Sequence, residues 1–457
     1  MTDIEKRYNL ALDYLYSFVD YSLKHSSELA KADFNLDRMF ALMESLGNPQ
    51  KKYPIIHVAG TKGKGSVSAL CAWGLKAAGY QVGLYTSPHL LDYTERIQVN
   101  GQPISHAQLI ELIEEIKPHV AKIEKLTTFE LTTALAFMAF ARNRINAAVF
   151  EVGLGGRLDA TNVITPKVSV ITSLSYDHMA VLGDTLAKIA AEKAGIIKES
   201  VPVVSSPQKD EALEVLERVA TQRHCALTLV GREVKFELLE SSLDGQVVSI
   251  WRRWSSSPKD VSRPAAYSTI NDEIKLRIPL LGLHQIENAV IAYVALKTCG
   301  LEITDAQIQN GFSRVHWPAR FEVVRREPPV ILDSAHNQDS FEKLREALEQ
   351  YFPGRPVYLI FGASEDKNIP GMFAEMKSKI KKLLITRADH PRALEVEAIQ
   401  KLAEQAGVES EAVTPVKPAL LRALELSAKD GSIVLSAGSI FVTAEVMQEW
   451  KSLNESA

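Results

Sequence analysis

The sequence has few of the features that mark secreted, membrane-spanning or disulfide-bonded proteins. Its 457 residues contain only three cysteines, Cys71, Cys225 and Cys299, and their wide spacing argues against a disulfide framework or a zinc site. We expect small, buried thiols in a reducing compartment. The longest nearly apolar run, residues 134–141, is well short of a membrane span. The N-terminus lacks the basic-then-apolar pattern of a signal peptide, so we predict a cytoplasmic protein.

The chain also lacks an excess of positive charge. It has 52 Lys and Arg against 56 Asp and Glu, a formal net charge of −4. This balance argues against a surface built for nucleic acid or an anionic membrane. The hydrophobic share of 46% and the charged share of 24% are ordinary for a soluble globular protein. The length exceeds what one core usually supports, and it predicts two domains.

The first part of the chain alternates β-branched runs with helical patterns. Continuous apolar strands separated by helices are typical of a parallel sheet covered on both faces, so we predict an α/β fold. The predicted strands are 54–59, 81–86, 147–152, 167–174 and 201–206, and the predicted helices are 64–79, 105–124, 129–143, 184–195 and 208–222.

The pattern changes between residues 235 and 278, where we predict strands with a surface excursion at 250–268. A helix at 284–300 follows. Pro318 lies in "VHWPARFE", between two patterned regions, and we place the domain boundary there, giving domains 1–316 and 317–457. The second is predicted to be a smaller, Rossmann-like α/β domain. Its predicted strands are 330–333, 356–362, 381–386 and 432–437.

A glycine-rich loop, "GTKGKGS" at residues 60–66, lies between the first predicted strand and the first predicted helix. A helix start offers free backbone N–H groups and a partial positive charge, which together bind anions. Lys64 can pair with a β- or γ-phosphate, and the Ser66 hydroxyl can lie near a metal or phosphate. The extra glycine between them makes this a variant of the phosphate-binding loop. The alternative is a strand–helix turn without a ligand; a dinucleotide fingerprint is not matched.

Three more polar residues follow predicted strands at the same sheet edge. Glu151 ends one strand, Ser87 follows another and His178 follows a third. Ligands gather at the carboxyl edge of open α/β sheets, and a carboxylate is a hard oxygen ligand suited to Mg²⁺. The alternatives are a loop-capping carboxylate, a turn serine before Pro88 and a hydrogen-bonded histidine.

Lys193 falls on the apolar face of its predicted helix, so it points into the protein. Burial lowers the pKa of a lysine and frees the neutral amine, which can react with CO₂ to form a carbamate. The alternative is a lysine that reaches outward and pairs with Glu192 or Asp184. The sequence alone leaves both open.

In this context the chain resembles the folylpolyglutamate synthase/dihydrofolate synthase family, within the Mur-type ATP-dependent amide ligases. Lys62 and Ser334 differ from that family, which often has Asn and Gly there. The matching stretches run in family order: "HVAGTKGKGS" (57–66), "LYTSPHL" (84–90), "ERI" (95–97), "FELTTALAF" (129–137), "EVGLGGRLDATN" (151–162), "SYDHMAVLGDTLAKIAAEKAGIIK" (175–198), "HQIENA" (284–289), "WPARFE" (317–322) and "DSAHN" (333–337).

The resemblance implies an ATP-dependent ligase that adds L-glutamate to folate, to dihydropteroate or to both, through an acyl phosphate. Phosphoryl transfer needs metal ions and fixed in-line geometry, and two Mg²⁺ ions are expected. By resemblance, Ser87, Glu151 and His178 are magnesium ligands and Lys193 is carbamylated. The residues implied in ATP binding are Gly60, Thr61, Gly63, Lys64, Gly65, Ser66, Asn288, Arg320 and Asp333.

The resemblance also implies the remaining roles. The second domain is expected to close over the nucleotide, and Lys64, Lys193 and His336 are expected to be catalytic. The pterin part of the substrate is assigned to Phe129, Arg157, Leu158, Asp159 and Ala160, while Lys367 and Arg392 are candidate glutamate contacts. "GGRLDATN" favours use of dihydropteroate, and the family is usually monomeric.

Each of these roles has an ordinary alternative. Phe129 can be a core residue, Asn288 a helix-surface residue and His336 a helix-start histidine, while Arg320 and Asp333 can form an interdomain salt bridge. Two other functions remain open, another Mur-type ligase or a nucleotide-binding module without ligation. The 50 residues before the loop are too few for the extra domain of a peptidoglycan ligase.

Overall fold

The computed structural model describes residues 2–20, 34–252 and 273–455. The chain forms two compact units. The first comprises Met1–Glu240, Val247–Pro279 and Gln285–Val315. The second comprises Ser241–Gln246, Leu280–His284 and His316–Ala457, so it includes two short segments from before residue 316. Most of the predicted excursion at 250–268 lies outside the described residues.

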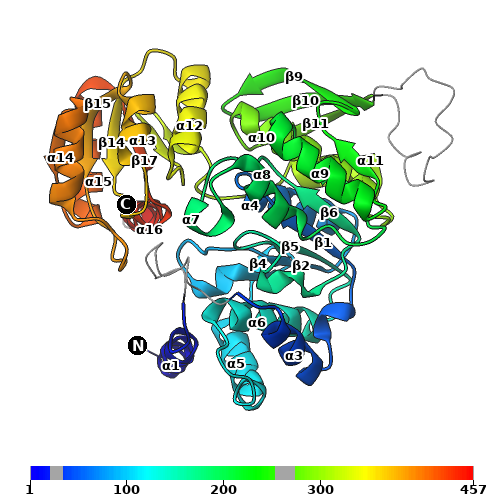
Figure 1. The fold of residues 1–457 in the computed structure, drawn as a ribbon. Helices are drawn as coiled ribbons and strands as arrows, with labels where there is room; N and C mark the ends of the chain where they lie inside the picture. Colours follow the sequence, from blue (N-terminus) through cyan, green and yellow to red (C-terminus); the bar gives the residue numbers. More distant parts are fainter. Residues whose placement is uncertain (1, 21–33, 253–272, 456–457) are drawn as a thin grey trace. The chain divides into compact units, whose positions relative to one another are not determined.

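An eight-stranded sheet forms the centre of the first unit (Figure 1). Six strands are parallel, and β3 and β4 add an antiparallel edge. The five predicted strands are present, whereas the two- and three-residue strands β3, β4 and β8 were not predicted. The order is β4 (Gln102–Pro103), β3 (Ile97–Val99), β2 (Val82–Tyr85), β5 (Ala147–Glu151), β1 (Ile55–Ala59), β6 (Val168–Ile171), β7 (Val203–Ser205) and β8 (Leu227–Leu229).

Side chains cap two of the predicted helices of the first unit close to their predicted starts. Thr127 caps α6 in a reciprocal box with Glu130, and Ser105 caps α5 in the same way. The unit's α-helices are α1 (Asp3–Tyr16), α3 (Asp37–Ser45), α4 (Lys64–Ala77), α5 (His106–Val120), α6 (Thr128–Arg142), α7 (Met179–Leu182), α8 (Leu186–Ala194), α9 (Asp210–Gln222), α10 (Leu283–Thr298) and α11 (Asp305–Phe312).

Two hydrophobic cores lie against this sheet. Phe150 of β5 packs on Phe137 of α6 with ring centroids 4.5 Å apart, within a core that also includes α5 and α1. Ile171 of β6 lies in a second core with residues of α8 and α9, including Ala190. Burial on both sides fixes the strands, and their carboxyl ends therefore form a firm edge for the loops.

Smaller sheets complete the described chain. β9 (Val234–Ser242), β10 (Gly245–Arg252) and β11 (Glu273–Ile278) form a three-stranded sheet, which agrees with the strands predicted there. The second unit contains a six-stranded sheet in which only β12 is antiparallel. Its order is β12 (Glu322–Arg326), β13 (Pro329–Leu332), β17 (Ile433–Ala437), β14 (Val357–Phe361), β15 (Ile380–Ile385) and β16 (Ser410–Ala412).

The four predicted strands of the second unit are confirmed, and β12 and β16 were not predicted. Its helices are α12 (Gln338–Tyr351), α13 (Ile369–Met376), α14 (Val396–Ala406), α15 (Val416–Asp430) and α16 (Ile440–Glu455). Within the described ranges, none of the helices combines the length and apolar character needed to cross a bilayer. Cys71 and Cys299 are buried free thiols and Cys225 is a partly buried one.

Candidate active site

The glycine-rich loop joins β1 to α4, as predicted. The backbone N–H groups of Thr61 and Lys62 donate to the Ser173 carbonyl at 2.9 and 3.1 Å. The Thr61 hydroxyl donates to the Ser175 carbonyl and accepts from the Ser175 N–H, both at 3.2 Å. The loop is therefore fastened to the segment after β6. α4 begins at Lys64 after Gly63, so the N–H groups of its first turn can bind an anion.

Two glycines of this loop are required by close contacts. A Cβ atom on Gly60 would lie 1.8 Å from the Thr172 Oγ1 atom, and one on Gly63 would lie 2.3 Å from the Asn288 Oδ1 atom. Gly63 also has a φ of +84°, which favours glycine. Asn288 is 7% exposed and donates to Gln285 Oε1 at 3.0 Å. The helix-surface alternative for Asn288 is therefore wrong, because its side chain packs against the loop.

Lys193 is buried beside the same loop. Its Nζ atom donates to the Gly60 carbonyl at 2.8 Å, and the residue is 4% exposed. Burial lowers the pKa of Lys193 to about 7, and the nearby positive charge of Lys64 adds to the shift. The predicted alternative partners are bonded elsewhere, since Glu192 accepts from Arg157 and Asp184 from Lys188. The site therefore holds an amine that can be neutral near pH 7.

A second lysine of the loop forms an ion pair that sequence reasoning missed. Lys62 Nζ lies 3.2 Å from Asp177 Oδ2, and the two side chains are 21% and 17% exposed. Asp177 directly precedes His178, so this pair ties the phosphate loop to the segment that carries the histidine. The basic loop tip offered the only signal in the sequence, because 115 positions separate the two residues.

The structure brings two of the three proposed metal ligands together. The Ser87 N–H donates to Glu151 Oε2 at 3.2 Å, and Glu151 is 5% exposed. His178 is the N-cap residue of α7 and has a left-handed backbone conformation, with its Nε2 atom 3.9 Å from Asp177 Oδ1. In the part of the chain that the structure describes, no cluster of three or more His, Cys, Asp or Glu could hold a metal. The Glu151 carboxylate and the Ser87 hydroxyl are hard oxygen donors, which suits Mg²⁺ with water completing its shell.

The loop after β5 is held between Phe129 and α8. A Cβ atom on Gly153 would lie 2.4 Å from Phe129 Cζ, and one on Gly156 would lie 2.9 Å from the Glu192 carbonyl oxygen. The Arg157 N–H donates to that same carbonyl at 2.7 Å, while its exposed guanidinium pairs with the Glu192 carboxylate at 2.8 Å. The glycines thus let this loop approach both the ring and the helix that carries Lys193.

Asp159 shapes this loop from inside. Its Oδ2 atom accepts from the Leu154 N–H at 2.9 Å, and its Oδ1 atom accepts from the Thr161 N–H at 3.0 Å and the Thr161 hydroxyl at 2.5 Å. Burial raises the pKa of Asp159, and these donors oppose the rise. Its neighbours Leu158 and Ala160 are half-buried and buried. The sequence did not single out Thr161, and nothing in the pattern predicted that its hydroxyl hydrogen-bonds to His57 of β1.

In the second unit, Asp333 fastens the segment that carries Arg320. The Asp333 carboxylate accepts from the backbone N–H groups of Phe321 and Ala335, both at 2.7 Å. Burial raises the pKa of Asp333, and the charge of Arg320 opposes the rise. Arg320 itself donates to the Ala319 carbonyl at 2.9 Å. Both charged residues belong to the second unit, so a salt bridge between the two would lie within one unit.

His336 lies just before α12, whose N-cap is Asn337. Its Nδ1 atom is 2.8 Å from the Ser334 carbonyl, so Nδ1 carries the proton and donates. The Ser334 N–H donates to the Ala319 carbonyl at 3.0 Å. Ser334, where the family often has glycine, is therefore accommodated in a loop that connects His336 to the Arg320 segment.

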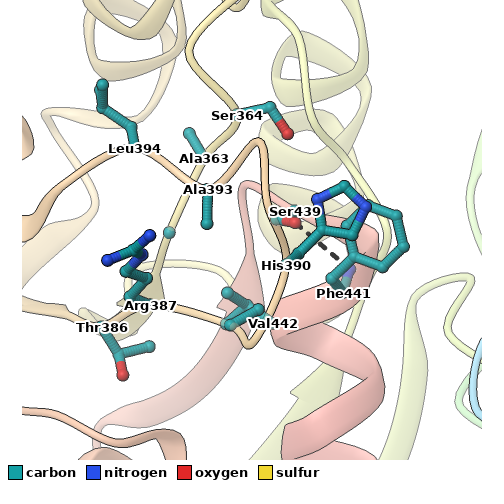
Figure 2. A pocket seen from close by; sticks show the side chains of 12 residues that line it. Ala363, Ser364, Thr386, Arg387, His390, Ala393, Leu394, Ser439, Phe441 and Val442 are labelled. Carbon is teal, nitrogen blue, oxygen red and sulfur yellow. Dashed lines mark hydrogen bonds between the residues drawn. The ribbon is translucent and has the colours of Figure 1, made fainter. Parts of the chain in front are cut away.

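A small, partly open pocket lies at the carboxyl edge of the second sheet (Figure 2). Thr386 and Ser439 come from the ends of β15 and β17. His390 and Phe441 stack beside it with ring centroids 3.9 Å apart. The Thr386 hydroxyl is buried and has no hydrogen-bond partner among the described residues. Such a group at a strand end is available to a ligand.

The two candidate glutamate contacts, Lys367 and Arg392, share one carboxylate partner and are close in sequence to residues that line this pocket. Lys367 Nζ lies 3.1 Å from Asp366 Oδ2, and Arg392 Nη2 lies 2.5 Å from Asp366 Oδ1. Burial acts against the charged form, but Lys367 and Arg392 hold the pKa of Asp366 below its usual value. The cluster thus places two cations around one carboxylate, with a net positive charge.

Comparisons with known proteins agree with both units. The model of the Mur ligase middle domain matches residues 58–296, and that of the Mur ligase glutamate ligase domain matches residues 319–440. The phosphate loop and the two α/β units therefore define a Mur-type ligase.

Individual relatives narrow this class. The chain is 34% identical over 429 residues to the dihydrofolate synthase/folylpolyglutamate synthase of Bacillus subtilis, covering 91% of this chain and 95% of the relative. The Escherichia coli protein of the same name is 32% identical, with 91% of each chain covered. A solved structure of Mycobacterium tuberculosis folylpolyglutamate synthase complexed with ADP is 31% identical, covers 98% of both chains and has a TM-score of 0.86. The chain belongs to the folylpolyglutamate synthase/dihydrofolate synthase family of ATP-dependent, ADP-forming ligases.

Proposed function

We propose that this protein joins L-glutamate to tetrahydrofolate, dihydropteroate or both, with release of ADP and phosphate. One observation carries the proposal: the buried Lys193 amine is hydrogen-bonded to Gly60, at the start of a phosphate-binding loop. A nucleotide-binding module without chemistry has no need for a buried amine there. Relatives named for both synthase activities, and a neighbour solved with ADP, support the same reaction.

The chemistry follows from the residues at the loop. The acceptor's carboxylate oxygen attacks the γ-phosphorus of ATP, the bond to ADP breaks, and an acyl phosphate forms. The glutamate amine then attacks the acyl carbon and phosphate leaves. Lys64 and the N–H groups of the first turn of α4 hold phosphate oxygens and stabilise charge that builds up on them. Asn288, packed on Gly63, positions the loop beneath the nucleotide.

Ser87, Glu151 and His178 would hold magnesium, and a carbamate on Lys193 would add an anionic oxygen close to a second ion. Bound Mg²⁺ neutralises phosphate oxygens during transfer. The buried Glu151 carboxylate beside Ser87 fits this donor chemistry. The lowered pKa of Lys193 supports the carbamate, since only the neutral amine reacts with CO₂.

The acceptor's pterin ring is assigned to the loop after β5. Phe129 offers an aromatic surface against Gly153, on which a flat heterocycle can stack. Arg157, Leu158 and Ala160 belong to the same loop and are assigned to the same substrate ring. For the second unit, we assign Arg320 and Asp333 to the nucleotide and His336 to the phosphoryl or glutamate side.

We assign L-glutamate to the second unit, with Lys367 and Arg392 as candidate contacts close in sequence to the residues that line the pocket shown in Figure 2. That pocket lies at the carboxyl ends of parallel strands, where ligands of such sheets bind. The Thr386 hydroxyl has no protein partner among the described residues, whereas the Arg387 guanidinium, 40% exposed, already pairs with the Glu395 carboxylate at 2.8 Å. The chain would act as a monomer in the cytoplasm, which size-exclusion chromatography and cell fractionation would test.

A phosphate-release assay tests the function. Purified protein receives Mg·ATP with dihydropteroate or tetrahydrofolate, each with and without L-glutamate. We expect phosphate release only when a pteroate-type carboxylate and glutamate are both present, with a product that is heavier by one glutamyl residue. Steady ATP hydrolysis without glutamate and without product would favour the non-ligating module. Ligation of glutamate to another acceptor alone would favour a different Mur-type substrate.

A further inference from the structure

A chain of buried hydrogen bonds joins β1 to the glycine loop at residues 153–162. His57 Nε2 lies 2.8 Å from Thr161 Oγ1, and Thr161 Oγ1 lies 2.5 Å from Asp159 Oδ1. Asp159 Oδ2 accepts from the Leu154 N–H at 2.9 Å. His57 and Thr161 have no exposed surface, and Asp159 is 5% exposed. The central strand that leads into the phosphate loop is thus connected to the backbone of the proposed pterin loop.

The direction of these hydrogen bonds can be assigned. Asp159 receives backbone N–H groups on both oxygens, so it is the acceptor. The Thr161 hydroxyl has one hydrogen and donates it to Asp159, so it accepts from His57 Nε2–H. The His57 Nδ1 atom then carries no proton, and it has no hydrogen-bond partner among the described residues. Burial lowers the pKa of His57 to about 3, with Lys198 adding to the shift, so the ring stays neutral.

We propose that His57 is a positioning residue for the acceptor site, held as the neutral Nε2–H tautomer so that it fixes Thr161, Asp159 and the glycine loop. The inference rests on the proposed function, in which this loop holds the pterin. The mechanism is geometric. Asp159 bonds to Leu154, the neighbour of Gly153, and Gly153 packs on the Phe129 ring. A buried strand is a rigid base, so the hydrogen bonds transmit its position to the loop.

Steady-state kinetics of hydroxyl variants test the role. Thr161→Val keeps the shape and removes the hydroxyl, which leaves His57 and Asp159 each short of a partner. We expect the KM for tetrahydrofolate or dihydropteroate to rise about tenfold, while the KM for ATP stays within about twofold. Thr161→Ser should behave like the parent. Thr298→Val is the matched control, because its buried hydroxyl donates to the Val294 carbonyl at 2.7 Å, within α10.

Histidine variants give a second, independent comparison. His57→Leu should raise the acceptor KM as Thr161→Val does, and His57→Gln should recover much of the loss because its amide retains a donor. An acceptor KM in folded Thr161→Val equal to that of Thr298→Val would overturn the proposal. So would a change confined to the KM for ATP.

The tautomer is testable without turnover. ¹⁵N-histidine NMR of the full chain should show, for His57, a protonated Nε2 and an unprotonated Nδ1 at pH 7. The resonance is assigned by its absence from His57→Gln. A protonated Nδ1, in the other tautomer or in an imidazolium, would overturn the hydrogen-bond direction even in a fully active ligase. Conversely, a protein that shows the expected tautomer and never ligates would refute the proposed function and leave the hydrogen-bond direction standing.

Discussion

At the scale of the residue, Lys193 is unusual because its amine is buried, whereas most lysines keep theirs in water. Burying a cationic amine costs free energy, so burial lowers the pKa of Lys193 to about 7. The folded protein therefore releases the Lys193 proton near neutral pH. Lys193→Ala should abolish ligation, and Lys193→Arg should not restore it, because arginine cannot carry a carbamate. ¹³C NMR with labelled bicarbonate should show a carbamate signal in the parent and none in Lys193→Ala. Full activity of the arginine variant would contradict the carbamate role.

The same shift predicts a pH dependence of stability. Between pH 7 and the ordinary lysine value of 10.5, the unfolded chain holds a proton on Lys193 that the folded chain lacks. Folding stability therefore rises with pH in this window, by at most about 1.4 kcal/mol per pH unit from this group. Lys193→Met should lose that contribution. Melting temperatures of both proteins, measured from pH 7 to 9.5 in CO₂-free buffer, would check it; parallel curves would contradict it.

Lys62 supports a third prediction at this scale. Its partly buried ion pair with Asp177 holds the phosphate loop against the His178 segment. Lys62→Asn should raise the KM for ATP roughly fivefold, about 1 kcal/mol, since partly shielded pairs exceed the surface median. Lys188→Asn, which breaks an exposed pair with Asp184, is the control and should have no effect. Equal ATP affinities in the two variants would show that the Lys62 pair does not position the loop.

At the scale of the element, the contact between the glycine loop and α8 depends on Gly156. A methyl group there would lie 2.9 to 3.1 Å from backbone atoms of Glu192 and Lys193. Backbone cannot move aside cheaply, so Gly156→Ala should lower the melting temperature by several degrees and reduce kcat. Gly47→Ala is the control: its φ of +73° strains the alanine by about 1 kcal/mol, but nothing lies within 4 Å. If Gly156→Ala lost stability but kept the parent kcat, the contact between this loop and α8 would not be needed for the reaction.

The strands and helices show how much of the fold could be predicted from the sequence. Strand–helix alternation predicted the main strands and helices of both sheets because each is a long, strongly patterned run. β3, β4, β8 and β16 were missed because two or three residues carry no period, and they form through pairing with a neighbour. The five-residue strand β12 was missed as well, and it pairs with β13 as an antiparallel edge. The helical periodicity correctly predicted that the Lys193 side chain is buried. The His57–Thr161 bond joins positions 104 apart, and the sequence offers no local pattern that could reveal it.

At the scale of the whole molecule, the second unit is not one continuous stretch of chain. Ser241 accepts a hydrogen bond from Gln350 at 2.8 Å, and the Gly282 N–H donates to the Tyr351 hydroxyl at 3.3 Å. Leu281 is buried in the core of that unit. The sequence placed the boundary at Pro318. The change of pattern at residues 235–278 was interpreted as strands with a surface excursion of the first domain, so neither short segment was assigned to the second.

This arrangement determines what a truncation at residue 316 should do. The fragment 1–316 retains the eight-stranded sheet and both of its cores, so it should fold, with a cooperative melt and native far-UV circular dichroism. It should not ligate, because Arg320, Asp333 and His336 are missing. Its melting temperature should fall below that of the full chain, since Leu281 and its neighbours lose their apolar partners. Leu281→Ser in the fragment should recover solubility without activity, whereas ligation by the fragment would place the entire reaction on the first unit alone.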